Sequence, residues 1–275
     1  MNRFFIRYPQ FRRKAFTLSF DDGVTHDVRM IETLNRYGLK CTFNLNGGAF
    51  DGSYTAGRPR LGRDAISVYD GHEVALHSFY HPFLEQLPAG NAAWEIVKDR
   101  EILESVFSRI IRGMAYPMGT LSDDVVATLH QCGVAYARTT KATHNFNIPD
   151  NWLRLDPTCH HTDPMLLQLC DDFLALQPKW GSKLFYVWGH SYEFEENHNW
   201  DLLDTMCEKM AGKDDIWYAT NMEIYDYLSA AGQIQSSVDG TRVYNPTAVT
   251  LWLEGDKVRC TLAPGQSLLL SEAGI

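Results

Sequence analysis

The stretch AFTLSFDDG, residues 15–23, decides the fold. Ala15–Phe20 has the apolar character of a buried strand, and two carboxylates and a glycine follow it at once. Because successive side chains of a strand point to opposite faces, Asp21 and Asp22 can reach one site only where the strand ends and the backbone turns. Gly23 gives the chain the freedom for that turn. Taken alone, the stretch also fits a surface turn without function.

Strand-like and helix-like segments alternate from this point to Ala231. Repeated units of a strand followed by a helix favour an α/β fold with a mainly parallel sheet or barrel and helices outside it. The expected strands are Ala15–Phe20, Cys41–Leu45, Glu73–Leu76, Met114–Tyr116, Val134–Ala137, Lys183–Trp188 and Ile216–Tyr218. The expected helices are Asp27–Tyr37, Asn91–Ile111, Ser122–Gln131, Asp163–Leu176, Asp201–Met210 and Glu223–Ala231.

Beyond Gly232 the pattern changes to short strands separated by turns rich in glycine, proline and asparagine. We therefore expect the parallel sheet or barrel over residues 1–231 and a small all-β appendage over residues 232–275. We expect the appendage to pack on the first domain, with dimerisation and glycan binding as the alternative roles. The five expected strands of the appendage are Gln233–Gln235, Thr241–Tyr244, Ala248–Leu253, Val258–Thr261 and Ser267–Leu270.

Charge and cysteine content limit the function classes. The 275 residues hold 34 acidic and 25 basic side chains, a net charge of −9, which disfavours a nucleic-acid partner. No apolar run reaches the roughly 18 residues of a membrane span. No apolar segment follows the basic residues Arg3 to Lys14, and the six cysteines form no C-x-x-C pair. We expect a cytoplasmic protein without a membrane partner; a homo-oligomer stays open.

Three later motifs follow expected strands. His77-Ser78-Phe79-Tyr80-His81 places two imidazoles four residues apart, a spacing that suits one divalent ion if the segment forms a helical turn. Pro82 favours a tight loop instead. Tyr116-Pro117-Met118-Gly119 can present backbone N–H groups to a ligand, and Trp188-Gly189-His190 ends an apolar strand with a histidine. Each motif alone also fits a purely structural role.

In this order the motifs resemble the polysaccharide deacetylase family, the NodB-homology carbohydrate esterases, over residues 14 to 230. The resemblance implies a distorted (β/α) barrel of about seven parallel strands and a divalent metal, usually zinc, with cobalt, manganese or nickel as alternatives. It implies Asp22, His77 and His81 as metal ligands, Asp21 as the catalytic base and His190 as the general acid. Met118 would donate its backbone N–H to an oxyanion, and Trp188, with Tyr116 and Pro117, would contact the substrate.

The implied site agrees with general chemistry. Three protein ligands leave a coordination position for water, and an amine leaves readily only when an acid protonates it. Two histidines and one carboxylate also fit non-haem iron oxygenases, but the second carboxylate and the distant histidine favour hydrolysis. We expect a hydrolase that removes an acetyl group, most simply N-acetyl, from a carbohydrate. The alternatives are a hydrolase of a small non-sugar amide and a non-catalytic carbohydrate-binding protein.

The sequence departs from the family pattern at the third and fourth motifs. Ala115 stands where the family has an arginine that steadies the base, Met118 replaces a tyrosine, and the fourth motif, an Asp and Trp pair, is not recognisable. Arg138 follows the next expected strand. Our hypothesis is that Arg138 reaches the site and substitutes for the missing arginine; the alternative is a solvated arginine at a strand end.

Overall fold

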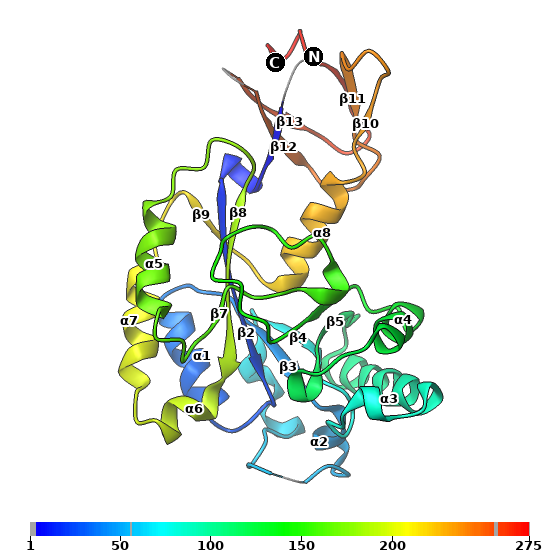
Figure 1. The fold of residues 1–275 in the computed structure, drawn as a ribbon, viewed down its shortest axis with the longest axis vertical. Coiled ribbons are helices and arrows are strands. Elements are labelled where there is room, and N and C mark those ends of the chain that lie inside the picture. Colours follow the sequence, from blue (N-terminus) through cyan, green and yellow to red (C-terminus); the bar gives the residue numbers. More distant parts are fainter. Residues whose placement is uncertain (1–3, 56, 256–257, 275) are drawn as a thin grey trace.

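A curled parallel sheet forms the centre of the computed structural model (Figure 1), which describes residues 4–55, 57–255 and 258–274. Arg3 of the basic N-terminal segment lies outside the described residues. The sheet order is β6-β5-β4-β3-β2-β8-β7, and β9 pairs with the first half of β2. The strands are β2 Lys14–Asp21, β3 Thr42–Leu45, β4 Glu73–Leu76, β5 Gly113–Ala115, β6 Tyr136–Arg138, β7 Cys159–His160, β8 Lys183–His190 and β9 Ile216–Tyr218.

Helices follow most of these strands and cover the outside of the sheet (Figure 1). The buried apolar residues of the longer helices belong to the two core clusters of the protein. The α-helices are α1 Asp27–Arg36, α2 Gly47–Asp51, α3 Ala89–Phe107, α4 Asp123–Gln131, α5 Leu166–Ala175, α6 Ser191–Glu196, α7 Trp200–Met210 and α8 Asn221–Ala231. Five 3-10 turns connect elements: Pro9–Phe11, Arg63–Tyr69, Leu84–Gln86, Pro117–Gly119 and Trp152–Arg154.

The segment from Leu155 to His160 brings the two edges of the sheet together. Leu155 forms a parallel bridge with Arg138 of β6, and β7, four residues later, pairs with β8. The backbone N–H of Thr139 donates to the carbonyl of Leu155, and that of Thr158 donates to Tyr186. The predicted distorted barrel of about seven parallel strands is therefore confirmed. β7 has only two residues and lies in an irregular segment, so the sequence pattern did not predict it.

The ends of the chain meet in a separate antiparallel sheet. β1 Phe5–Arg7 pairs with β12 Leu251–Glu254, which pairs with β13 Arg259–Leu262. A second sheet has the order β10-β11-β14, with β10 Gln235–Ser236, β11 Arg242–Tyr244 and β14 Ser267–Leu269. The predicted all-β texture after Gly232 is present, but the β12 sheet also includes an N-terminal strand.

A second cluster of buried apolar residues joins the barrel to the β12 sheet. Tyr8 and Tyr227 of the barrel side pack with Leu251 and Leu253 of β12, and the Tyr227 hydroxyl accepts from the backbone N–H of Trp252 at 3.1 Å. This shared core holds the C-terminal strands against α8. The division into residues 1–231 and 232–275 stays a prediction.

Most predicted elements agree with the structure to within a few residues, and the strands Glu73–Leu76 and Ile216–Tyr218 agree at both ends. The short elements α2, α6, β1 and β7 were not predicted. No helix among the described residues is long and apolar enough to cross a membrane. All six cysteines are free thiols.

Candidate active site

The carboxyl end of β2 brings the two adjacent aspartates to one edge of the barrel. Asp21 is the last residue of β2 and is buried, with 3% of its surface exposed. Asp22 has a φ of 82°, so the backbone turns at the aspartate itself, one residue before Gly23, whose φ is 64°. This left-handed turn lets both carboxylates face the same end of the sheet, as predicted for a strand that ends at Asp21.

His77 and His81 lie on a tight loop after β4, so of the two interpretations the tight loop is confirmed and the helical turn is wrong. Ser78 and His81 have positive φ values of 62° and 56°, outside the range of a right-handed α-helix. Two internal side chains hold the loop. Asp99 of α3 accepts the backbone N–H of His77 at 3.0 Å, and Asn46 donates to the carbonyls of His77 and Ser78, each at 2.8 Å.

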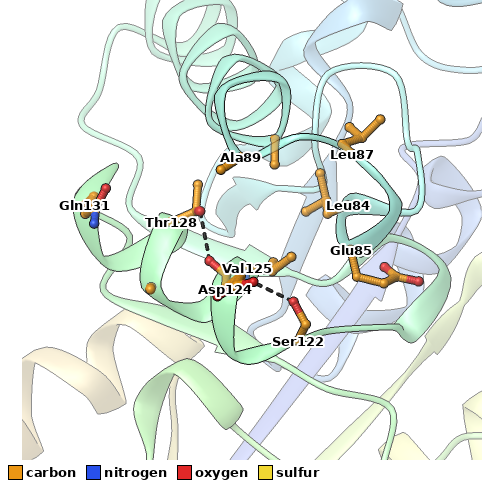
Figure 2. Close-up of a pocket in the computed structure, with 11 residues that line it drawn as sticks. Leu84, Glu85, Leu87, Ala89, Ser122, Asp124, Val125, Thr128 and Gln131 are labelled. Atoms are coloured by element: carbon orange, nitrogen blue, oxygen red, sulfur yellow. Dashed lines mark hydrogen bonds between the residues drawn. The ribbon is translucent and has the colours of Figure 1, made fainter.

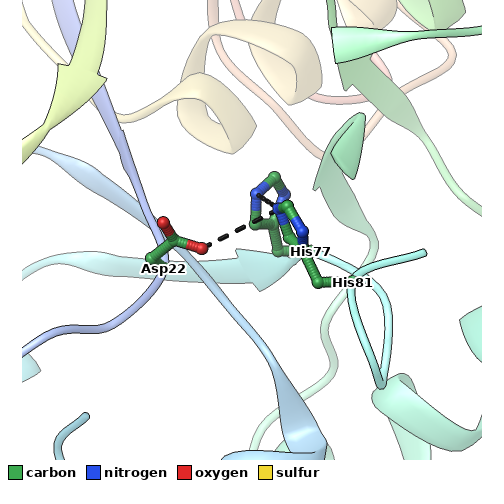
Figure 3. Close-up of side chains that lie close together, drawn as sticks. All are labelled: Asp22, His77 and His81. Carbon is green, nitrogen blue, oxygen red and sulfur yellow. Dashed lines mark hydrogen bonds and ion pairs between the residues drawn. The ribbon is translucent and has the colours of Figure 1, made fainter. Parts of the chain in front are cut away.

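Asp22, His77 and His81 converge as a metal site requires (Figure 3). The two Nε2 atoms of His77 and His81 are 3.0 Å apart, and His81 Nε2 is 3.8 Å from Asp22 Oδ1. His77 Nδ1 donates to the carbonyl of Ala115 at 2.9 Å, which leaves the lone pair of Nε2 free for a cation. The three residues therefore fit a divalent metal by tautomer and by convergence.

The electrostatics of the two imidazoles agree with ligation. Burial lowers the pKa of His77, although Asp21 and Asp22 oppose this shift. Burial and the neighbouring His77 lower the pKa of His81 to about 4. Both rings are thus neutral at neutral pH, the form that binds a metal.

Asp21 lies between a guanidinium and two imidazoles. Burial opposes the charge of Asp21, but Arg138 outweighs it together with His77 and His190, and lowers the pKa of Asp21 to about 2. Arg138 Nη2 forms an ion pair with Asp21 Oδ2, both side chains being almost fully buried. Asn44 Nδ2 donates to the other oxygen, Oδ1, at 2.8 Å. Arg138 therefore reaches Asp21, as our hypothesis about the missing arginine requires.

His190 lies on the Asp21 side of the same cavity that His77 and His81 line. Its Nε2 is 4.0 Å from Asp21 Oδ2, and its Nδ1 is 3.2 Å from Glu193 Oε2. Burial lowers the pKa of His190, but the contact with Glu193 and the charge of Asp21 outweigh burial, so that the net shift is upward. An upward shift of the pKa of His190 favours the protonated ring, the form that can donate a proton.

These side chains line a cavity of about 270 Å³. Tyr116, Met118 and Trp188 line it together with Asp21, Asp22 and the three histidines, whereas Pro117 is buried and is not among its described lining residues. Met118 has a φ of 59° and is half-exposed. The Arg138 guanidinium lies 4.3 Å from the centre of the Trp188 ring, so the tryptophan also covers the ion pair with Asp21.

Sequence reasoning missed several residues of this site. Asn44 is the register partner of Asp21 on the neighbouring strand, and the rule that parallel strands end at one edge could have found it. Tyr192 and Thr140 line the cavity, two residues after His190 and Arg138 respectively. Arg60, from a loop remote in sequence, donates to Asp22 Oδ1 at 3.2 Å, and no local signal indicates it.

A slightly larger hollow of about 300 Å³ lies elsewhere, between α3 and α4 (Figure 2). Leu84, Leu87 and Val125 give it apolar walls, and its described lining residues include Glu85 and Asp124 but no imidazole. Asp124 and Ser122 serve as helix-end groups there: Ser122 Oγ accepts the backbone N–H of Val125 at 3.2 Å. Size alone does not mark a reactive site.

The chain is similar to known proteins in its N-terminal half. The polysaccharide deacetylase family model matches residues 9–137. A chitooligosaccharide deacetylase of Bradyrhizobium sp. (strain ANU 289) is 30% identical over 146 residues, and one of Sinorhizobium fredii is 29% identical over 140 residues. These matches cover 51% and 50% of this chain and 60% and 59% of the relatives' own lengths. The resemblance to the polysaccharide deacetylase family is confirmed.

Solved structures share the fold at low identity. A Mycobacterium smegmatis protein proposed to be a polysaccharide deacetylase aligns with a TM-score of 0.60 and 14% identity, covering 84% of this chain and 96% of that one. A family 4 carbohydrate esterase pseudoenzyme from Bacillus anthracis aligns with a TM-score of 0.51 and 16% identity, covering 81% of this chain and 68% of that one. At these identities the alignments show a shared fold alone.

Proposed function

We propose that this relative of the polysaccharide deacetylases is a metal-dependent hydrolase that removes an acetyl group, most simply N-acetyl, from a carbohydrate. One observation carries the proposal. Two neutral imidazoles and a carboxylate converge from two loops on one side of a cavity. A buried, ionised carboxylate and a histidine with a raised pKa line the same cavity. A divalent metal held by Asp22, His77 and His81, with zinc our proposal, would supply Lewis acidity for water and the acyl oxygen.

The chain's own residues would divide the remaining work. Asp21 takes the proton of the attacking water, and the ion pair with Arg138 keeps its carboxylate charged and fixed. The backbone N–H of Met118 would donate to the oxyanion that forms on the acyl group. His190 then gives its Nε2 proton to the departing amine. Tyr116 and Trp188 form walls of the cavity against the acetyl group.

Acetate release tests this function directly. The purified chain is stripped with a chelator, reloaded with Zn²⁺, and given N-acetylglucosamine, chitooligosaccharides, an O-acetylated sugar and a simple acetamide. We expect release from at least one acetylated sugar, loss after stripping, and recovery on reloading. Asp22→Ala should lose both metal and activity, whereas the exposed control Asp70→Ala should keep both.

Other outcomes select the alternatives. Release from the simple acetamide alone would indicate a hydrolase of small non-sugar amides. Binding of sugar without acetate release by the metal-loaded chain would indicate a non-catalytic carbohydrate-binding protein. A cytoplasmic location, which the cysteine pattern favours, remains part of the proposal and favours a soluble sugar over an intact cell-wall polymer.

A further inference from the structure

Three aromatic side chains, Tyr54, Tyr80 and Trp94, form a row on the surface, which we call the aromatic row. Neighbouring rings are in contact: the ring centroids of Tyr54 and Tyr80 are 6.3 Å apart, and those of Tyr80 and Trp94 are 6.0 Å apart. Tyr80 is 40% and Trp94 49% exposed, whereas Tyr54 is half-buried. Single apolar residues are normal on a protein surface, but a contiguous set of exposed rings indicates a binding surface.

The aromatic row adjoins the candidate active site. Tyr80 is the residue before His81, on the loop that carries both metal-ligand histidines. The guanidinium of Arg60 lies 4.7 Å from the centre of the Tyr54 ring, and the same guanidinium donates to Asp22 Oδ1 at 3.2 Å. Two of the three rings are therefore directly linked to the residues that would hold the metal.

Hydrogen bonds and close packing hold the aromatic row in place. Glu95, buried on α3, accepts the backbone N–H of Tyr80 at 2.8 Å. Gly48 donates its N–H to the carbonyl of Phe79 at 3.3 Å and accepts the N–H of Tyr54 at 2.9 Å. A Cβ atom at Gly48 would lie 2.7 Å from that carbonyl oxygen and 2.8 Å from the Cβ of Tyr54, so only glycine permits this approach.

Tyr80 and Trp94, the most exposed members of the row, share one supporting ring. The buried Phe79 meets their rings at 65° and 83°, with centroid separations of 4.5 and 5.4 Å. The planes of Tyr80 and Trp94 are inclined to each other by only 32°. Because both rings stay about half-exposed on this common support, they can contact successive units of one extended ligand.

The chemistry of the row favours a sugar chain as its ligand. Tyrosine and tryptophan combine an apolar ring with a hydroxyl or an N–H group, and none of the three side chains is charged. A pyranose with equatorial hydroxyl groups has the matching character, with C–H groups on its faces and hydroxyl groups around its rim. Successive sugar rings of a linear chain are also separated by a length comparable with the spacing of these aromatic rings.

The size of the row argues against a second protein chain. Fully buried aromatic side chains cover about 150–250 Å² each, so three partly exposed ones supply much less than the roughly 800 Å² that each partner of a stable protein interface buries. A narrow row of rings suits a narrow ligand instead.

We propose that Tyr54, Tyr80 and Trp94 bind a linear saccharide chain of β-linked pyranoses that continues from the sugar in the active site. The placement of the acetylated sugar next to the row rests on the proposed function, whereas saccharide binding by the row does not. The preferred substrate is accordingly an oligosaccharide and not a single sugar, with Tyr80 and Trp94 under the units next to the acetylated one.

Binding of chains without acetyl groups tests the proposal separately from hydrolysis. The zinc-loaded full chain is titrated calorimetrically with a β-1,4-linked glucosamine pentamer, cellopentaose and xylopentaose, and with the matching monosaccharides. We expect at least one pentamer to bind 10-fold or more tightly than its monosaccharide. Trp94→Ala should weaken that pentamer about 10-fold, the size expected when one ring loses its stacking partner. Trp94→Phe, which keeps a ring, should restore most of the affinity.

Trp180→Ala is the matched control. Trp180 is 66% exposed and packs on Phe5 at a centroid separation of 5.3 Å, on a part of the surface that the proposal does not use. Its replacement should leave pentamer affinity unchanged, and circular dichroism checks that each variant is folded. Failure of every pentamer to bind would overturn the proposal, as would equal pentamer affinity of the wild type and Trp94→Ala.

An activity arm separates this proposal from the proposed function. The ratio of kcat/KM for chitopentaose to that for chitobiose should fall about 10-fold in Trp94→Ala and stay at the wild-type value in Trp180→Ala. Acetate release with a ratio that does not depend on Trp94 would overturn the row and leave the proposed function standing. Trp94-dependent binding of a pentamer without acetate release from any substrate would support the row and contradict the proposed function.

Sedimentation tests the remaining occupant, a second copy of this chain. The wild type and Trp94→Ala should sediment alike at the concentrations used for titration. A dimeric wild type that becomes monomeric in Trp94→Ala, with unchanged pentamer affinity, would show that the row is a contact between copies and would overturn the proposal.

Discussion

Two buried arginine–carboxylate pairs lie at opposite ends of β2, and they differ in how completely the carboxylate is satisfied. At the amino end, Glu254 accepts from Arg7 at 2.5 Å, Arg13 at 3.0 Å and Arg259 at 2.7 Å. At the carboxyl end, Asp21 has one guanidinium, that of Arg138, and an amide from Asn44.

The remaining neighbours of Asp21 are imidazoles at 3.8 and 4.0 Å, too far for hydrogen bonds. Asp21 therefore keeps acceptor capacity that opens onto a cavity, whereas the acceptors of Glu254 are occupied by three guanidinium groups. A buried ion pair alone therefore does not tell a structural contact from a candidate reactive site. The two pairs differ in whether the carboxylate has lone pairs that no donor uses.

The largest expected effect is the loss of turnover when Asp21, whose carboxylate keeps unused lone pairs, is substituted. Asp21→Asn keeps the shape and the contact with Asn44 but cannot accept a proton, so we expect turnover to fall about 1000-fold or more. Bound metal should stay at the wild-type level, since Asp22, His77 and His81 are intact. Acetate release and metal content on the same preparation check this; full activity would show that Asp21 is not the base.

At Glu254, which accepts from three arginines, a substitution should lower stability and leave turnover unchanged. Glu254→Gln leaves three clustered guanidinium groups without a counter-charge, and we expect the free energy of unfolding to fall by about 3–5 kcal/mol. Turnover per folded molecule should not change, because the pair is remote from the cavity. Urea unfolding measures the effect, with the exposed Glu208→Gln of α7 as control. A loss of turnover without a loss of stability would erase the distinction between the two pairs.

A third buried carboxylate, Asp27, has hydroxyl partners but no cation. Tyr69 and Ser191 donate to it at 2.9 and 2.5 Å. Burial outweighs these bonds and raises the pKa of Asp27 to about 7. Because the folded-state pKa exceeds the unfolded value, the folded state holds the proton more tightly, and stability is lost as pH rises from about 4 to about 7.

Asp27→Asn should remove this pH dependence. Between pH 5 and 7.5 the wild type should lose about 2–3 kcal/mol more unfolding free energy than the variant, a figure from the difference between the folded and unfolded pKa values. Urea unfolding at the two pH values measures the difference. Identical pH slopes for the two proteins would show that Asp27 is ionised in the fold.

The smallest expected effect concerns the geometry of Arg138. Arg138→Lys keeps the charge but loses the planar fork and the stacking on Trp188, so turnover should fall about 10-fold. Arg138→Ala should fall further and raise the pKa of Asp21, which would shift the acidic limb of the pH–rate profile upward. Unchanged turnover in Arg138→Ala would remove Arg138 from the list of residues that position the base.

The sequence predicted what local pattern and strand ends determine. The strand before Asp21, the loop between His77 and His81 as one of two interpretations, and a role for Arg138 near the site all follow from residues close to strand ends. The helical interpretation of His77 to His81 failed because Ser78 and His81 adopt positive φ values, which their residue types do not announce.

Contacts between distant segments were not predictable in the same way. The pairing of β1 with β12 joins residues almost 250 positions apart, and three-residue strands such as β1 carry too little periodicity to be recognised. Nothing in the sequence shows that β7 and the residue after it bring His160 and His161 against Glu193.

The antiparallel joint of β1 and β12 has a consequence for biosynthesis. A ribosome releases β1 first and β12 some 240 residues later, so the buried Arg7 has no counter-ion and β1 no neighbour for most of translation. Until β12 is synthesised, the edge of β1 is unpaired and the side chain of Arg7 lacks Glu254. Closure of this sheet therefore waits for β12, and nascent chains stalled before Leu251 cannot complete it.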